Sequence, residues 1–158
     1  MINLILLLVI GVFCFLIFKN SKKAKLQALE NETLAADFLA TNGKADDVHE
    51  TTSGLQYKIE HSAGNEAKPH TSSKVNVHYH GTLMDGSVFD SSVVRNSPIS
   101  FGLNQVIAGW TEGLQLMSEG DKFTFYIPPQ LAYGRKRVGS IPPGSLLIFE
   151  VELLKIES

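Results

Sequence analysis

The chain has 158 residues, 44% of them hydrophobic, with a formal net charge of −2. This length suits one domain with an additional segment. The near-neutral charge, without interleaved aromatic and basic residues, argues against a nucleic-acid-binding surface, and a single cysteine, Cys14, excludes an intramolecular disulfide.

An apolar leader opens the chain. Residues 4–18 contain no polar side chain, and four lysines follow at once: Lys19, Lys22, Lys23 and Lys25. An 18-residue helix rises about 27 Å, close to the thickness of a bilayer's hydrocarbon core. No basic residue precedes the apolar run and no small-residue cleavage site ends it, which favours an uncleaved anchor at residues 1–18 over a signal peptide. We therefore expect a single-pass protein of the inner (cytoplasmic) membrane. Because positive flanks favour the cytoplasmic side, the lysines predict a cytoplasmic domain.

Residues 19–51 are expected to join the leader to the folded domain. Leu26 to Thr41 are rich in helix-forming residues, and Asn42-Gly43 is a helix-ending signal. The apolar stripe of this segment is weak, which favours a short, solvated spacer helix. A dimerising helix is the alternative, but the segment is too short for a convincing heptad array. Lys44 to Thr51 are polar and predict a linker.

The folded domain is expected at residues 52–158, where short runs alternate apolar and polar side chains as strands do. The predicted strands are Leu55 to Ile59, Val75 to Leu83, Ile99 to Gly102, Phe123 to Ile127 and Leu147 to Leu153. Asp85-Gly86 is a two-residue hairpin signature, with a short strand after it. Pro128-Pro129 forces the chain out of the sheet.

One helix is predicted within this domain, from Val106 to Met117. Its apolar residues recur at intervals of three and four: Ile107, Trp110, Leu114 and Met117. Gly109 and Gly113 each weaken so short a helix by roughly 1 kcal/mol relative to alanine. Their missing side chains must therefore serve either a close-approaching ligand or tight packing on the sheet. The whole pattern predicts an α+β fold in which an antiparallel sheet wraps one short helix.

The sequence shows no catalytic constellation of the common nucleophilic enzymes. It has no nucleophile elbow, no glycine-rich phosphate loop and no cysteine after residue 18. His78 and His80 share one face of a predicted strand, but no third ligand is obvious nearby, which favours a solvated pair over a metal site. We expect neither a metal nor a cofactor. The residues that recur at strand ends and loops are aromatic: Tyr79, Phe89, Phe101, Trp110, Tyr133 and Phe149.

All of these aromatic residues except Phe101 lie in a set of six motifs. The motifs are Tyr79-His-Gly81, Asp85-Gly-Ser-Val-Phe-Asp-Ser-Ser92, Val106-Ile-Ala-Gly-Trp110, Leu131-Ala-Tyr-Gly134, Ile141-Pro-Pro143 and Phe149-Glu-Val-Glu-Leu-Leu154. In this order and spacing, from about Thr52 to Glu157, the chain resembles the FKBP-type peptidyl-prolyl isomerases. Phe38-Leu-Ala-Thr-Asn-Gly43, ahead of the domain, resembles the bacterial Mip-like branch. Relatives in that branch carry a longer helical dimerisation region, whose place the predicted anchor and spacer would take, so the oligomeric state stays open.

The resemblance implies that the sheet is curved and carries a proline pocket on its concave side. The implied substrate-binding residues are Tyr79, Phe101, Val106, Ile107, Ile141 and Phe149. The implied catalytic residues are Asp90, Tyr133, Phe89 and Trp110. Trp110 would form the floor of the pocket, Asp90 and Tyr133 would form a polar rim, and the backbone N–H of Ile107 would bind a ligand carbonyl. Arg95 would pair with Asp90.

Such a pocket implies isomerisation of X–Pro bonds in polypeptides, without a cofactor, as an aid to protein folding. Rotation about an X–Pro bond faces a barrier of roughly 18–20 kcal/mol but breaks no covalent bond, so an aromatic pocket without a nucleophile suits it. Two other interpretations stay open. One is a membrane-tethered module or chaperone that binds proline segments without catalysis, and the other is a structural domain with Trp110 fully packed.

The resemblance leaves open the substrate preference and the side of the membrane on which the domain lies. Ile99 stands where the family often has an aromatic residue, and the loop from Gly134 to Ser140 is basic. A macrolide is a further candidate ligand whose binding the sequence does not decide. Several bacterial relatives act outside the inner membrane, so a periplasmic domain is the alternative to the cytoplasmic one.

Overall fold

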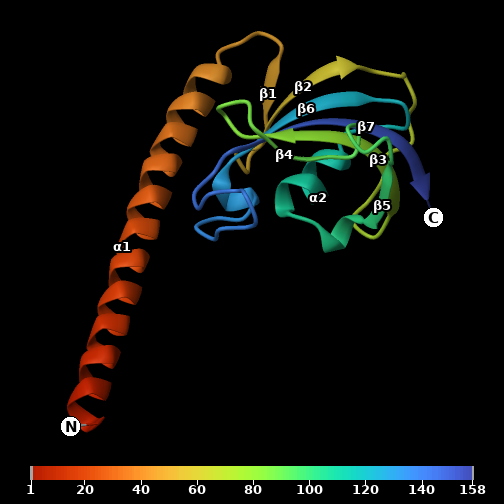
Figure 1. Ribbon diagram of the computed structural model, residues 1–158. Coiled ribbons are helices and arrows are strands. Elements are labelled where there is room, and N and C mark those ends of the chain that lie inside the picture. Colours follow the sequence, from red (N-terminus) through yellow and green to blue (C-terminus); the bar gives the residue numbers. More distant parts are fainter. Residues whose placement is uncertain (1, 158) are drawn as a thin grey trace.

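The computed structural model describes residues 2–157, without the side chains of residues 2–18. A long helix, α1, precedes a seven-stranded antiparallel sheet, and the sheet arches over a second, short helix, α2 (Figure 1). This arrangement confirms the predicted α+β fold with a sheet wrapped around one short helix.

The sheet has the strand order β1-β2-β6-β7-β3-β4, and β5 also pairs with β3. The strands are β1 (Val48–Glu50), β2 (Gln56–His61), β3 (Lys74–Thr82), β4 (Val88–Ser91), β5 (Ile99–Gly102), β6 (Lys122–Ile127) and β7 (Leu147–Glu157). β5 and β4 pair with successive parts of β3, so both lie at the same edge of the sheet. Along β3 and β7 buried positions alternate with more exposed ones, as the period-two pattern predicted.

Local signals place the ends of several strands as predicted. Gly86 has φ 82°, and the N–H of Leu83 donates to the carbonyl of Ser87 at 2.9 Å, which closes the hairpin between β3 and β4. β6 ends at Ile127, immediately before Pro128. Single 3₁₀ turns, η1 (Leu103–Gln105) and η2 (Pro129–Leu131), follow β5 and β6.

Helix α2 (Ala108–Leu114) is shorter than the predicted Val106–Met117. Beyond its end, the N–H groups of Leu116 and Met117 donate to carbonyls three residues back, a tightening common in a helix's last turn. Met117 is nevertheless fully buried, so the predicted apolar face continues past the helix.

The packing of α2 against the sheet explains why this helix contains two glycines. A Cβ on Gly109 would lie 2.5 Å from Cγ2 of Ile127, and one on Gly113 would lie 2.7 Å from Cε1 of Phe125. Both neighbours belong to β6 and both are fully buried. Tight packing on the sheet, and not a close-approaching ligand, accounts for these glycines.

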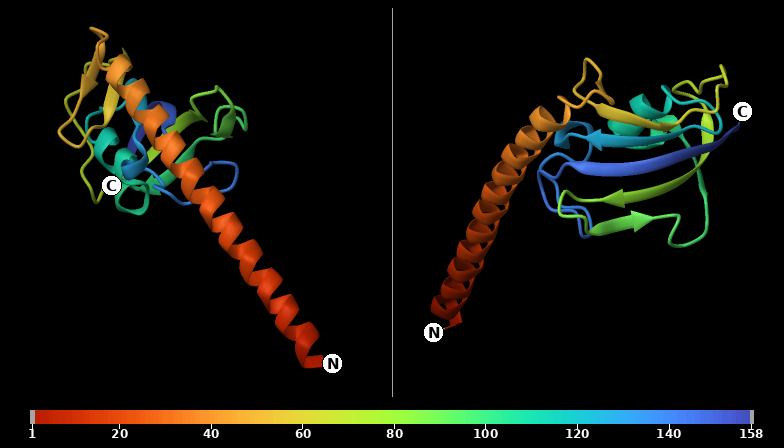
Figure 2. Two further views of the ribbon diagram at one scale, coloured as in Figure 1. Left: turned by 90° about the vertical axis from the view of Figure 1, so that its left-hand side faces the viewer. Right: turned by 90° about the horizontal axis from the view of Figure 1, so that it is seen from above.

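Helix α1 (Ile2–Asn42) runs as one continuous helix, where the sequence predicted an anchor helix and a separate spacer helix. It ends at Asn42, as the Asn-Gly signal indicated. The solvated spacer was the wrong interpretation, because Ala28 and Ala35 are buried against the domain. The predicted linker at residues 44–51 also contains a short strand, β1. The N-terminal part of α1 extends beyond the domain (Figure 2).

The predicted membrane anchor finds no support within the described part of the chain. No helix described there is both long enough and apolar enough to cross a membrane. The leader at residues 1–18, on which that prediction rests, has side chains that lie outside the described residues.

Candidate active site

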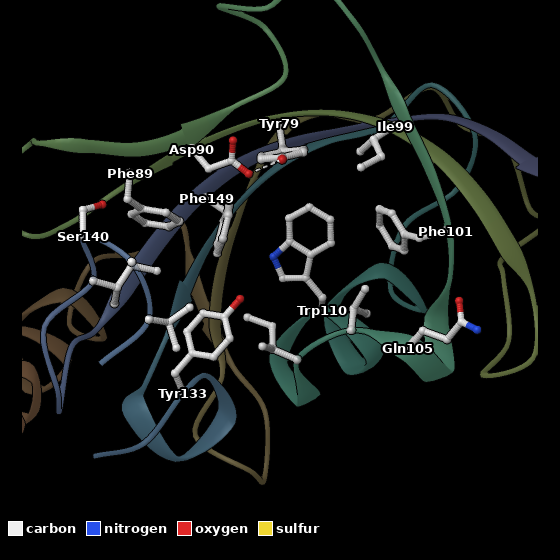
Figure 3. Close-up of a pocket in the computed structure, with 15 residues that line it drawn as sticks. Tyr79, Phe89, Asp90, Ile99, Phe101, Gln105, Trp110, Tyr133, Ser140 and Phe149 are labelled. Atoms are coloured by element: carbon white, nitrogen blue, oxygen red, sulfur yellow. Dashed lines mark hydrogen bonds between the residues drawn. The ribbon is translucent and has the colours of Figure 1, made fainter. Parts of the chain in front are cut away.

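A cavity of about 670 Å³ opens on the concave side of the sheet, above α2 (Figure 3). It is lined by Tyr79, Phe89, Asp90, Ile99, Phe101, Gln105, Val106, Ile107, Trp110, Tyr133, Val138, Gly139, Ser140, Ile141 and Phe149. All ten residues that the sequence analysis assigned to the site are among them. Elements distant in sequence therefore bring these residues together around one space.

Trp110, on α2, forms the floor of the cavity. Its ring meets the rings of Tyr79 and Phe149 edge to face, with centroids 5.2 and 5.0 Å apart, and that of Phe101 at 5.2 Å. These are favourable geometries for aromatic pairs. Trp110 is 6% exposed. Its indole ring is thus fixed by its neighbours and still borders the cavity, which argues against a solid aromatic core.

Phe89 and Phe149 form one wall because Gly81 makes room for them. Their rings pack edge to face with centroids 5.3 Å apart. A Cβ on Gly81 would lie 2.7 Å from Cζ of Phe89 and 2.8 Å from Cε1 of Phe149. The glycine in the Tyr79-His-Gly81 motif is therefore a packing requirement of the pocket wall.

A polar cluster stands at the edge of this wall. The hydroxyl of Tyr79 donates to the Asp90 carboxylate, which also accepts from the guanidinium of Arg95. A second N–H of Arg95 donates to the Tyr79 hydroxyl at 3.1 Å. Pairing across β3 and β4 sets Gly81 opposite Asp90, which brings the carboxylate near Tyr79. The expected pairing of Arg95 with Asp90 is present.

These contacts set the ionisation of the cluster. Burial raises the pKa of the Asp90 carboxyl, but the hydrogen bonds from Tyr79 and Arg95 outweigh burial and leave this pKa below its ordinary value. Burial, and then the hydrogen bond to Asp90, raise the pKa of the Tyr79 hydroxyl. The hydrogen bond to Asp90 raises the pKa of Arg95. At neutral pH the cluster holds an ionised carboxylate, a protonated phenol and a charged guanidinium.

Two further residues of the predicted site offer hydrogen-bond donors at the mouth of the cavity, through a backbone N–H and a hydroxyl. Ile107 is the residue immediately before α2, where backbone N–H groups have no acceptor within the helix. Tyr133 follows η2 and is more exposed than the floor and wall residues. Figure 3 shows its hydroxyl directed toward the interior of the pocket.

The histidine pair lies outside the cavity. His78 and His80 each place Nδ1 at 2.9 Å from a serine hydroxyl, those of Ser92 and Ser91. In the described part of the chain, no group of three or more His, Cys, Asp or Glu side chains could hold a metal ion.

Sequence reasoning missed four lining residues. Gln105 directly precedes the Val106-Ile107 motif, and the other three, Val138, Gly139 and Ser140, belong to the basic loop that was expected near the pocket rim without any of its residues being assigned to the site. A bridge between Val138 and Ile141 folds this loop over the pocket. Tyr133 and Ile141, which flank this loop and were assigned to the site, were the signals in the sequence that pointed to the loop as a wall.

Two family models match the chain. Residues 65–154 match the model described as FKBP-type peptidyl-prolyl cis-trans isomerase. Residues 15–59 match the model described as the domain amino terminal to FKBP-type peptidyl-prolyl isomerase.

Individual relatives agree with these models. The FKBP-type peptidyl-prolyl cis-trans isomerase FkpA of Aeromonas hydrophila is 53% identical over 135 residues, 85% of this chain and 50% of its own length. The outer membrane protein MIP of Legionella longbeachae is 43% identical over 143 residues, 90% of this chain and 61% of its own length. This chain thus spans about half to three fifths of the length of these relatives.

The fold of a solved relative agrees as well. The crystal structure of FkpA from Escherichia coli superposes with a TM-score of 0.87 at 39% identity, covering 94% of this chain and 70% of that one. With a family model matched over more than half of its residues, and with FkpA- and MIP-type relatives, the chain belongs to the FKBP-type peptidyl-prolyl cis-trans isomerase family.

Proposed function

We propose that this chain is a peptidyl-prolyl cis-trans isomerase that accelerates rotation about X–Pro bonds in polypeptides and so assists protein folding. The observation that carries the proposal is the cavity floored by Trp110, between aromatic walls and the cluster of Asp90, Tyr79 and Arg95. Membership of the family supports the same activity.

The pocket suits a proline ring. The pyrrolidine ring is compact and apolar, and the face of Trp110 offers a flat apolar surface of similar breadth. Apolar walls from Phe101, Phe149 and Val106 surround that surface. Residues on either side of the proline then extend over the mouth, where Ile107 and Tyr133 offer hydrogen-bond donors.

Catalysis follows if the pocket binds the twisted amide more tightly than either planar isomer. Twisting the C–N bond removes amide resonance and leaves the carbonyl less polarised, so the twisted form loses less hydration on entering an apolar site. The N–H of Ile107 and the hydroxyl of Tyr133 orient the chain around the rotating bond. No proton is transferred in this scheme, and no metal or cofactor takes part.

Asp90 has a role in this scheme that does not require proton transfer. Its carboxylate is ionised and already accepts from two donors, which fixes its position beside Phe89. During rotation the dipole of the substrate's amide carbonyl changes its direction. The fixed negative charge of Asp90 stabilises the orientation in which the positive, carbon end of that dipole faces the carboxylate. Phe89 then closes the wall against water.

The proposal places the isomerase domain at residues 52–158. Residues 1–18 would be an inner-membrane anchor and residues 19–51 would connect the anchor to the domain, with the domain on the cytoplasmic side. The uncharged run of residues 4–18 and the lysines after it support this part of the proposal.

The activity is tested with the refolding of a protein whose slow step is X–Pro isomerisation. The full chain, added in catalytic amounts without metal or nucleotide, should shorten that step. If the slow phase keeps its rate while a proline peptide still binds the pocket, the chain is a binding module for proline segments and not an isomerase.

A further inference from the structure

The loop that forms one wall of the cavity also contacts α1 on its other side. We call residues 133–144 the rim loop. On its inner side it lines the cavity with Tyr133, Val138, Gly139, Ser140 and Ile141. Figure 1 shows its ribbon, in blue, beside the middle of α1. The same loop is thus shared between the pocket and the long helix.

Polar contacts join the outer side of the rim loop to one stretch of α1. Arg135 donates to both carboxylate oxygens of Glu32, at 2.7 and 2.8 Å. Arg137 donates to the side-chain oxygen of Gln27 at 3.0 Å. The side-chain amide of Asn31 donates to the carbonyl of Pro143 at 2.8 Å. Side chains about one helical turn apart on α1 therefore bind the rim loop both near its start, at Arg135 and Arg137, and near its end, at Pro143.

The backbones of helix and loop also meet. Ala28 is 1% exposed, and an added Cβ on Gly144 would lie 2.3 Å from its carbonyl oxygen. Gly144 has φ +76°, a conformation that L side chains rarely adopt. Only a small residue on α1 and a glycine on the loop permit this approach.

A second attachment fixes α1 near its C-terminal end. The buried side chain of Gln56, on β2, donates to the carbonyl of Leu39 and accepts from Asn42, both at 2.9 Å. The ring centroids of Phe38, on α1, and Tyr126, on β6, lie 5.8 Å apart. With two separated attachments, the helix is a fixed support for the loop.

We propose that Gln27, Ala28, Asn31 and Glu32 of α1 are positioning residues for the pocket: they hold the rim loop in its binding-competent place and so set the affinity for X–Pro substrates. This inference rests on the proposed isomerase function. Within itself the loop is closed by a hydrogen bond from Gly144 to Gly134 and by the Val138–Ile141 bridge. Those bonds fix its shape, whereas α1 fixes its distance from Trp110. If the loop leaves this place in some of the molecules, only the remaining fraction is competent to bind. The apparent Kd then equals the intrinsic Kd divided by that fraction, so the measured affinity falls.

A matched pair of substitutions on α1 tests the idea in the full chain. Ala28→Gln puts a long side chain between helix and loop, whereas Leu29→Gln makes the same kind of change at a neighbouring position that is 55% exposed. We expect Ala28→Gln to raise KM for an X–Pro peptide with a smaller effect on kcat, and to shift the amide NMR signals of residues 138–141. Leu29→Gln should do neither.

Charge reversal provides a second test that does not disturb packing. Glu32→Arg and Arg135→Glu should each raise KM by about two- to fivefold, the scale of one partly exposed ion pair. The double variant, which restores the pair in reversed order, should return KM toward the parent value. Lack of rescue, or equal KM for the Ala28 and Leu29 variants with unmoved rim-loop signals, overturns the proposal.

The fluorescence of Trp110 separates this proposal from the proposed activity. The chain has one tryptophan, so a titration with a proline peptide reports on the pocket alone. If the parent binds the peptide but does not isomerise it, the isomerase proposal fails. The dissociation constants of the same variants then still decide whether α1 positions the loop.

Discussion

The hydroxyl of Tyr79 on β3 donates its hydrogen bond to the carboxylate of Asp90 on β4, at the edge of the aromatic pocket. The Tyr79 hydroxyl, one of the few polar groups at the site, is therefore hydrogen-bonded to another residue of the site. Asp90 is 44% exposed, so its fixed position comes from these bonds and not from packing.

Asp90→Ala and Phe89→Ala should each reduce kcat/KM for an X–Pro peptide by about tenfold or more, while the melting temperature changes by only a few degrees. Both residues border the cavity, and neither belongs to the fully buried core. Activity and melting should be measured on the same samples. Asp47→Ala is the matched control, because it removes an exposed ion pair with Lys58, at 3.0 Å, that lies outside the cavity lining. If activity falls only in step with the folded fraction, these two site residues are structural.

The pH dependence of activity should be flat through neutrality. The folded-state pKa of Asp90 lies below its ordinary value, so the stability that its ionised form contributes is present above about pH 4, the ordinary range, and is lost as pH falls through the folded pKa. The pKa of Tyr79 is raised, which keeps its hydroxyl protonated on the alkaline side. We expect constant kcat/KM between about pH 6 and 8 and a decline only in acid. In the Asp90→Asn variant, the part of the acid decline in kcat/KM that comes from protonation of Asp90 should be absent. A bell-shaped pH profile of kcat/KM centred near neutrality would instead indicate proton transfer.

Gly109→Ala should destabilise the domain although alanine favours a helix. The gain in helix propensity is about 1 kcal/mol, whereas overpacking a close contact costs about 1–3 kcal/mol. The new Cβ would press on Ile127, which is fully buried on β6. Urea unfolding measures the change. Increased stability would mean that the glycine serves something other than packing.

The orientation of the domain is a separate prediction. Lysines directly after an apolar run resist translocation, so the C-terminal domain should remain in the cytoplasm. Protease added to intact spheroplasts should leave the domain whole until the membrane is lysed. Digestion in intact spheroplasts, with a cytoplasmic control preserved, would put the domain in the periplasm, and release of the full chain by carbonate would rule out the anchor.

The sheet was predictable because its signals are local. Alternation along β3, β6 and β7 and the Asp85-Gly86 turn each follow from a few neighbouring residues. The resemblance then brought distant residues such as Tyr79 and Trp110 into one pocket, which periodicity alone could not do.

The docking of α1 was not predictable in the same way. Among the side chains of α1 that the structure describes, at residues 19–42, the buried ones are the small Ala28 and Ala35, while the leucines of the weak apolar stripe, among them Leu26 and Leu29, stay exposed. Apart from the ring contact of Phe38 with Tyr126, the α1 contacts described above are polar or involve backbone atoms, which leave no periodic trace in a sequence. For the same reason Val138, Gly139 and Ser140 were missed as lining residues, because their contribution depends on how the loop folds back and not on residue type.

The central claim is tested most directly by NMR exchange between the cis and trans signals of an X–Pro peptide, with and without the full chain. Uncatalysed interconversion takes tens to hundreds of seconds at 25 °C. We expect the chain to bring exchange onto a timescale of a second or less at low molar ratio, and Asp90→Ala to lose most of that effect. A well-folded chain that leaves the exchange rate unchanged would contradict the account.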